Sequence, residues 1–349
     1  MKHVYTSIFT LALLAVSSHS FAQGPNNSGT YYQAADGKKG AELKTALCAI
    51  ITNGHTSNTY GSLWVHFETT DKRSDGKVWD MYSNKSNFTY GSSDQDSGSG
   101  GSTEGDKFNR EHSFPNSWFG GDKNSIMYSD LFHMYPTDKL VNNKRGNNPF
   151  GETNGDSFKS ANNFSKLGTC TYEGYSGKVF EPNDIYKGDF ARTYFYMVTR
   201  YENEIPTWYT KYGVNGEKGE ETQKAVLATL DGETYPGLLS WQLNMMMKWS
   251  KNDPIDQPIE KETPRNNAVY DIQNNRNPFI DYPGLEEYIW GSLKDVAFSY
   301  DDYQSPTAIM TIKAEPTYKE GVMYNLSGQV VDKSYKGIVI LNGKKFVNK

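Results

Sequence analysis

The hydrophobic pattern begins with an apolar run over residues 8–16, shortly after the basic residue Lys2. Small residues stand at positions 20 and 22, the −3 and −1 positions of a cut before Gln23. This pattern predicts a signal peptide over residues 1–22, because the run is too short to cross a bilayer. No later segment approaches twenty apolar residues, so we expect an exported chain without stable membrane insertion.

Several segments of the mature chain carry apolar residues with the period of an α-helix. In residues 41–52 they stand at positions 43, 46, 47, 50 and 51, and Gly54 follows. A second helix is expected within residues 60–90, followed by an extended segment near residues 78–82. The remaining predicted helices are the aromatic segment 188–201, the segment 238–250 that Asp253-Pro254 ends, and the polar segment 266–280 that ends at Asn277-Pro278.

Two segments interrupt this pattern. Residues 91–107 are rich in Gly and Ser and carry acidic residues, which indicates a loop. From about residue 305 the chain changes to short β-patterned runs separated by Gly, over residues 310–318, 321–332 and 336–349. We therefore predict an α+β protein with a mixed helical and β domain over residues 23–303 and a small β-rich module over residues 304–349.

Composition and charge restrict the function. With 25 Tyr, 17 Phe and 7 Trp, the chain favours a loop-rich fold anchored by aromatic side chains. Removing Lys2 with the signal peptide leaves 35 basic and 41 acidic side chains, a net charge of −6. That sign disfavours a global positive field for nucleic acid, so a nucleic-acid binder of this composition needs a local basic groove and a bound cation. The two cysteines, Cys48 and Cys170, permit either one bridge or two buried thiols.

The candidate chemistry centres on His112 and the preceding Glu111. No HExxH, paired HxH or Cys/His cluster is present, which argues against a multi-histidine zinc site. On a strand, neighbouring side chains point to opposite faces, so one can bind a cation while the other activates water. By itself such a pair is more often a surface glutamate beside a structural histidine.

A second segment adds to this pair. Residues 138–147 predict a helix that Thr137 or Asp138 can cap. Asn142 and Arg145 are three residues apart and share a helical face. An amide oxygen, a carboxylate and several waters suit Mg²⁺, and Arg145 can donate two hydrogen bonds to a phosphate. A solvated helix face is the alternative for these two residues.

Four ordered motifs together resemble the bacterial endonuclease I family over roughly residues 40–295. They are NREHSFPNSWFGG at 109–121, DLFHMYPTDKLVNNKRGNNPFGE at 130–152, FARTYFYM at 190–197 and QNNRNPFIDYPG at 273–284. The resemblance implies a catalytic domain over residues 23–303 built around a ββα-metal (His-Me finger) element. The C-terminal run YNLSGQVVDKSYKGIVILNGKKFVNK resembles a sorting module of the type IX secretion route, or else is a β-hairpin that packs on the catalytic domain.

The resemblance also implies roles for individual residues. His112 matches the general base, Glu111 and Asn142 match the metal ligands, and Arg145 and Arg192 match the arginines that contact phosphate. The expected cofactor is Mg²⁺, or another divalent cation such as Mn²⁺ or Ca²⁺. The other histidines of the mature chain are expected to be supporting or structural residues: His133, His55 and His66.

These roles predict a single-metal hydrolysis of DNA, and possibly RNA, with weak sequence preference and with 5′-phosphate and 3′-hydroxyl products. The predicted enzyme is a monomer that is secreted to the periplasm, the medium or the cell surface. Two other functions fit parts of the sequence. An exported glycan-binding module fits the aromatic and acidic composition and predicts no cleavage of plasmid. A phosphatase for small phosphoesters predicts activity on p-nitrophenyl phosphate but not on DNA.

Overall fold

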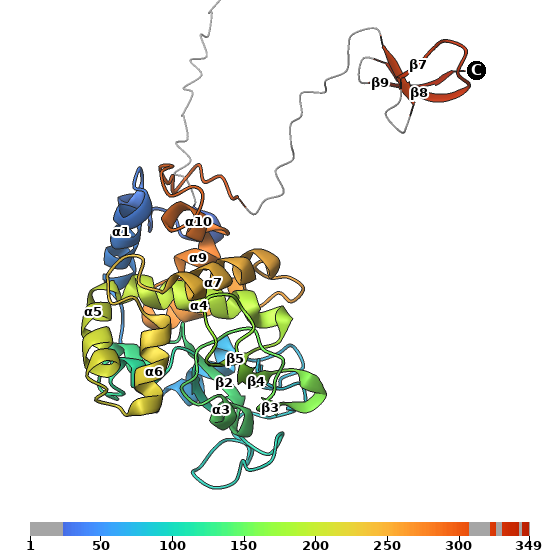
Figure 1. The fold of residues 1–349 in the computed structure, drawn as a ribbon. Helices are drawn as coiled ribbons and strands as arrows, with labels where there is room; N and C mark the ends of the chain where they lie inside the picture. Colours follow the sequence, from blue (N-terminus) through green and yellow to red (C-terminus); the bar gives the residue numbers. More distant parts are fainter. Residues whose placement is uncertain (1–23, 307–321, 326–329, 342–343, 349) are drawn as a thin grey trace, which may run out of the picture. The chain divides into compact units, whose positions relative to one another are not determined.

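The structure, a computed structural model, describes residues 24–306, 322–325, 330–341 and 344–348 (Figure 1). The predicted signal peptide and the β-patterned run at 310–318 lie outside these residues. The chain divides into two compact units, the first ending at Gln304 and the second beginning at Ser305.

Helix α4 (Lys187–Arg200) lies at the centre of the first unit. It packs against α1 (Gly40–Thr52), α7 (Ser240–Asn252) and α9 (Pro278–Asp281). Every residue of α4 after Lys187 is buried. Further α-helices are α2 (Leu63–Thr70), α5 (Ile205–Trp208), α6 (Glu220–Thr229), α8 (Glu262–Gln273) and α10 (Leu285–Ile289). Short 3₁₀ helices are η1 (Pro25–Asn27), η2 (Gln33–Ala35), η3 (Asn116–Phe119), η4 (Ile126–Ser129), η5 (Ala161–Asn163), η6 (Asp184–Tyr186) and η7 (Glu202–Glu204), and Tyr209–Val214 form a π-helix, η8.

The helices predicted from periodicity at 41–52, 188–201 and 238–250 are confirmed as α1, α4 and α7. The prediction of one helix over 266–280 is wrong in its bounds. Helix α8 ends at Gln273 because Asn274 adopts the left-handed conformation, with φ 57°. Asn277-Pro278 then begins α9 instead of ending α8: the Asn277 side chain accepts a hydrogen bond from Phe279 N, and proline suits the first helical position.

The segment 60–90 contains the predicted helix, α2, and the extended segment predicted near residues 78–82 forms no regular strand. Val78 forms only an isolated bridge with Lys72. The following loop, residues 91–107, has neither helix nor strand, as predicted. Side chains hold it against the domain: the Glu104 carboxylate accepts from Ala161 N, and Lys139 pairs with Asp96 at 2.8 Å.

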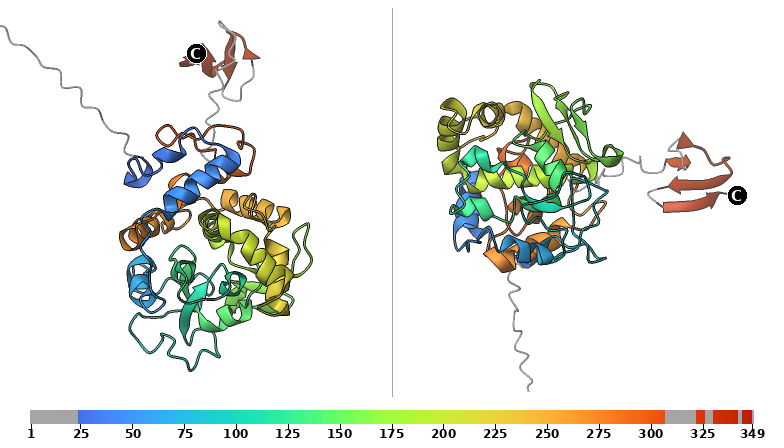
Figure 2. Two further views of the ribbon diagram at one scale, coloured as in Figure 1. Left: turned by 90° about the vertical axis from the view of Figure 1, so that its left-hand side faces the viewer. Right: turned by 90° about the horizontal axis from the view of Figure 1, so that it is seen from below.

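A ββα element follows this loop. Strand β1 (Phe108–His112) pairs antiparallel with β2 (Met134–Asp138), with His112 opposite Met134. The chain leaves β2 directly into helix α3 (Lys139–Arg145). Asp138 caps this helix, because its side chain accepts from Val141 N at 3.0 Å. The element lies at the end of the domain opposite α1 and α10 (Figures 1 and 2).

Two further sheets complete the α+β architecture, and both are antiparallel. The first has the order β3-β4-β5, from Phe158–Lys159, Lys166–Thr169 and Lys178–Glu181. The second lies in the C-terminal unit, with the order β7-β6-β8-β9. Its strands are β6 (Met323–Asn325), β7 (Val330–Val331), β8 (Gly337–Leu341) and β9 (Lys344–Asn348). The predicted fold class is thus confirmed, and the tail has the β character that its sequence indicates.

The core of the first unit is largely aromatic. Phe114, Trp118, Phe150 and Tyr194 are buried together beneath the ββα element, with Phe114 and Tyr194 edge to face at 5.3 Å. Cys48 and Cys170 are both buried free thiols, which decides between the two possibilities that the sequence left open. In the part of the chain that the structure describes, the helices are all too short or too polar to cross a bilayer.

Candidate active site

A polar pocket of about 300 Å³ opens between β1, the turn after it and α3. Glu111, His112 and Asn142, three of the predicted site residues, line it together. Its other lining residues are Tyr60, Asn109, Arg110, Pro115, Asn116, Asn143, Gly146 and Asn147. The ββα element therefore brings together the predicted base and the two predicted metal ligands.

Glu111 presents one carboxylate oxygen to the protein and one to the pocket. Oε1 accepts a hydrogen bond from Tyr82 OH at 2.8 Å and pairs with Arg145 Nη1 at 2.5 Å. The carboxylate also accepts a hydrogen bond from the backbone amide of His112. Burial raises the pKa of Glu111, while Arg145 and Tyr82 act in the opposite direction by stabilising the charged form.

Asn142 is held in a complementary way. Its Nδ2 donates to Asn109 Oδ1 at 2.8 Å, a bond that leaves Asn142 Oδ1 as the group with lone pairs to offer. Because Asn142 and Glu111 line the same pocket, a neutral and an anionic oxygen are available in one place.

His112 is fixed by hydrogen bonds at both ring nitrogens. Nε2 lies 2.9 Å from the carbonyl oxygen of Tyr128, and Nδ1 lies 3.1 Å from Asn116 Nδ2. A carbonyl only accepts, so Nε2 carries the proton and Nδ1 carries the lone pair. The basic nitrogen is therefore the one on the side of Asn116, a pocket-lining residue.

The surroundings of His112 keep the imidazole neutral. The ring is 6 % exposed and packs edge to face on Tyr128, with centroids 4.5 Å apart. Burial lowers the pKa of His112 well below its ordinary value, and the nearby His133 ring adds to this effect. A neutral imidazole at physiological pH is the form that can accept a proton.

Arg145 does not face the pocket. It is buried, and Nη1 donates to Glu111 Oε1 and to the carbonyl of His112, while Nη2 donates to the carbonyl of Ser113 at 2.6 Å. The Phe150 ring packs against the guanidinium, and the ring centroid lies 4.6 Å from the guanidinium carbon. The structure thus gives Arg145 the position of a support for Glu111 and the strand end, where the sequence suggested a phosphate contact.

Arg192 lies farther still from the predicted role. It projects from α4 and pairs with Glu262 through Nε and Nη2, at 2.5 and 2.6 Å. Its other N–H groups donate to Ser250 and to the carbonyl of Asp253. The guanidinium is 2 % exposed, so no donor is free for a phosphate.

The remaining histidines hold positions outside the pocket lining. His133 is fully buried beside His112, with ring centroids 5.5 Å apart, and its Nε2 bonds to the carbonyl of Met127. Its backbone carbonyl accepts from the amide and hydroxyl of Ser113. His133 therefore supports the strand pair that presents His112, while His55 and His66 lie away from the pocket.

The sequence reasoning missed Arg110, which lines the pocket. Its guanidinium carbon lies 3.5 Å from the ring centroid of Tyr60 and 4.5 Å from that of Trp64, and Nη1 donates to the Tyr60 carbonyl. Arg110 forms no ion pair with a carboxylate in the described part of the chain. A period-two reading of the strand could have found it, since Arg110 and His112 share a face.

The donor set suits a hard divalent cation. No cluster of three or more His, Cys, Asp or Glu able to hold a metal occurs among the described residues. Glu111 Oε2 and Asn142 Oδ1 supply only two protein oxygens. That number fits Mg²⁺, which keeps several waters and completes its shell with substrate phosphate.

Comparison with known proteins identifies the family of this chain. The family model described as Endonuclease I matches residues 39–284. The chain is 35% identical over 264 residues to a protein of Bacillus amyloliquefaciens named extracellular ribonuclease, covering 75% of this chain and 78% of the relative. A protein of Bacillus subtilis (strain 168) with the same name is 33% identical over 269 residues, covering 76% and 79%.

The chain is therefore a nuclease, an enzyme that hydrolyses phosphodiester bonds. It belongs to the endonuclease I family, which confirms the resemblance carried by its four motifs.

Proposed function

We propose that this protein is an exported endonuclease that cleaves RNA and DNA with little sequence preference, using His112 as general base and one divalent cation. The orientation of His112 is the observation that carries the proposal. The Tyr128 carbonyl holds the proton on Nε2, so Nδ1 is the atom that accepts a proton from the attacking water. Asn116 keeps the ring in place through the same nitrogen until water and substrate enter.

Glu111 and Asn142 hold the cation, which we propose to be Mg²⁺, with Mn²⁺ or Ca²⁺ as other candidates. When bound, such an ion neutralises negative charge on the phosphate and on the departing 3′ oxygen. Tyr82 and Arg145 orient the Glu111 carboxylate by donating hydrogen bonds to Oε1, which leaves Oε2 for the cation.

Arg110 takes the phosphate-binding role that the sequence analysis gave to Arg145 and Arg192. It is the arginine that lines the pocket, and its ring contacts hold the guanidinium in place without neutralising it. A cation so placed donates hydrogen bonds to phosphate oxygens. A positive charge at the pocket attracts the phosphate locally, so a chain with a net charge of −6 can still bind nucleic acid.

Attack of water on phosphorus with departure of the 3′ oxygen leaves a 5′-phosphate and a 3′-hydroxyl and needs no 2′-hydroxyl. We therefore propose activity on both RNA and DNA; the name extracellular ribonuclease given to both relatives supports RNA as one substrate. The same names, with the N-terminal signal sequence, support secretion. We further propose that residues 304–349 serve in sorting, since the residues that line the pocket all lie between 60 and 147.

The direct test incubates purified residues 23–349 with supercoiled plasmid and with RNA, in Mg²⁺ and in EDTA. We expect cleavage of both in Mg²⁺, none in EDTA, and end labelling that detects 5′-phosphates. The variant His112→Ala should still bind both substrates but should cleave them much more slowly than the wild type does. Cleavage that persists in EDTA, or products with 2′,3′-cyclic ends, would contradict the proposal.

A further inference from the structure

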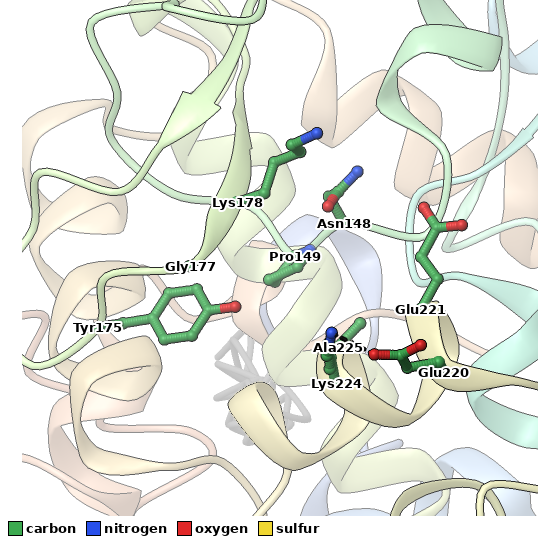
Figure 3. Close-up of a pocket in the computed structure, with 9 residues that line it drawn as sticks. All are labelled: Asn148, Pro149, Tyr175, Gly177, Lys178, Glu220, Glu221, Lys224 and Ala225. Atoms are coloured by element: carbon green, nitrogen blue, oxygen red, sulfur yellow. Dashed lines mark hydrogen bonds and ion pairs between the residues drawn. The ribbon is translucent and has the colours of Figure 1, made fainter.

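A second pocket has a volume of about 450 Å³, and Figure 3 shows the side chains that line it. It is lined by the segment after α3, the start of β5 and the first turn of α6. Gly146 and Asn147 line the active pocket, and the next two residues, Asn148 and Pro149, line the second one. The volume lies within the range of small-ligand sites.

Gly146, which lines the active pocket, is the point of nearest approach to the second pocket that the glycine geometry shows. A Cβ placed on this glycine would lie 3.4 Å from Glu221 Oε1 and 3.8 Å from Asn148 Nδ2. The glycine has φ 58°, a conformation that a residue with a side chain rarely adopts. Glu221 and Asn148, which line the second pocket, therefore lie close to a residue that lines the active pocket.

Glu221 differs from its neighbour Glu220 in having no basic side chain as an ion-pair partner among the described residues. Glu220 pairs with Lys224 at 2.6 Å, one helical turn along α6. The Glu221 carboxylate is exposed and has neither an ion pair nor a hydrogen bond with any described residue. An unpaired carboxylate next to a phosphodiester site repels the substrate backbone. It can bind the substrate only by accepting hydrogen bonds from neutral donor groups.

The rest of the second pocket offers an aromatic wall and a cation. Tyr175 stacks on Trp241, with centroids 4.7 Å apart and planes at 17°, and lies across Pro149 from Glu221 (Figure 3). Lys178 is exposed and lines the same pocket. Asn148 Nδ2 donates to the carbonyl of Arg145, so its Oδ1 can accept.

We infer that this second pocket is a nucleobase subsite that takes the base beside the scissile phosphate and favours guanine through Glu221. The inference rests on the proposed nuclease function of the adjoining pocket. Single-stranded bases are read on their Watson–Crick edges and packed against aromatic side chains in this way. The base enters beside Tyr175 and Pro149 with its edge toward Glu221.

Guanine is the base whose edge matches this arrangement. Its N1–H and 2-amino group are two neighbouring donors that one carboxylate accepts together, and its O6 accepts from a lysine such as Lys178. Adenine and cytosine present a single amino group on that edge, and uracil a single N–H. The preference is graded, because the adjoining pocket still acts on the backbone of every sequence.

The test measures relative kcat/KM by sequencing the cut sites in a random pool of single-stranded oligoribonucleotides. The wild type should favour guanine at one nucleotide flanking the cut by about tenfold, the effect of one hydrogen bond to a charged group in the transition state. Glu221→Gln should reduce that ratio to about twofold or less while cleavage at other sites continues. Glu220→Gln is the matched control and should keep the full ratio.

Inosine in place of guanosine removes the 2-amino group and should lower the preference in the wild type but not in Glu221→Gln. Equal cleavage at all four bases by the wild type, or an unchanged ratio in Glu221→Gln, would overturn the inference. Failure of the proposed function has a different signature, since the wild type would then cut no oligonucleotide in Mg²⁺.

Discussion

Arg145 Nη1 lies 2.5 Å from Glu111 Oε1, and both side chains are buried at the junction of α3 and β1. The same guanidinium binds the carbonyls of His112 and Ser113. Helix α3 thus supplies Asn142 to the pocket from one turn and anchors the strand end that carries Glu111 from the next. The arginine acts on the pocket through the carboxylate that it orients.

Arg145→Met should destabilise the protein and weaken cation binding. Removing one partner of a buried pair costs about 3–5 kcal/mol, and loss of a group that orients a metal ligand lowers affinity by roughly 10–100-fold. Urea unfolding and a Mg²⁺ titration of the folded variant measure the two effects. Lys144→Met, an exposed change on the same helix, serves as control. Unchanged Mg²⁺ affinity in folded Arg145→Met would show that Glu111 is oriented by other groups.

The neighbours His112 and Glu111 should fail differently when removed. His112→Ala should bind Mg²⁺ and nucleic acid as the wild type does, with a rate lower by roughly 10²–10⁴-fold, because only the base is lost. Glu111→Ala should lose cation affinity, and excess Mg²⁺ should restore part of its rate. Metal titrations of both variants by calorimetry separate these outcomes. Equal Mg²⁺ binding by both, or full activity of His112→Ala, would contradict the assignment of roles.

The pH profile should carry the titration of His112. Burial lowers the pKa of this histidine below its ordinary value of 6.5, so the neutral, proton-accepting form dominates above that pH. Activity should therefore persist through pH 6.5 and fall only as the pH drops through the lowered pKa, where imidazolium forms. The check is kcat/KM against pH at saturating Mg²⁺. His112→Ala should lack this acid limb, and a midpoint above pH 6.5 in the wild type would be inconsistent with the buried neutral ring.

Arg192 should matter for stability and not for phosphate binding. Arg192→Met leaves Glu262 buried without its partner and should cost about 3–5 kcal/mol in free energy of unfolding. The double variant Arg192→Met with Glu262→Met should recover much of that loss, since it removes both charges. Denaturation curves test this, and KM for nucleic acid at low temperature should stay near the wild-type value in each folded variant. A large rise in KM with unchanged stability would restore the phosphate role.

Arg110→Ala should weaken the handling of substrate without loss of the cation. A charge-assisted contact to phosphate contributes about 1.5–3 kcal/mol, so kcat/KM should fall by roughly 10- to 150-fold. The salt dependence of binding should lose about one unit of slope. Lys123→Ala removes an exposed charge near the same Tyr60 ring and is the matched control. If both variants behave alike, the contribution of Arg110 is only general electrostatic attraction.

The sequence predicted most accurately those structural features that are formed by residues close together in the chain. The buried pattern of α4, the helix α1, the cap by Asp138 and the loop 91–107 all follow from residues close together in the chain. The ββα element was predicted from the resemblance that the four motifs carry. Two of these motifs contain Glu111, His112 and Asn142, which line the pocket together. The extended segment expected near Val78 forms only an isolated bridge, because strand pairing depends on a partner that the local pattern does not show.

The sequence by itself determined the fold class, the family and the three residues that meet in the pocket. The tertiary structure alone decided where the arginines lie and which groups they contact. An arginine has the same charge and donors wherever it stands, and its role depends on which carboxylate folding brings near. Glu111 is 34 residues from Arg145 and Glu262 is 70 residues from Arg192, so only the packed fold pairs them and leaves Arg110 facing the pocket.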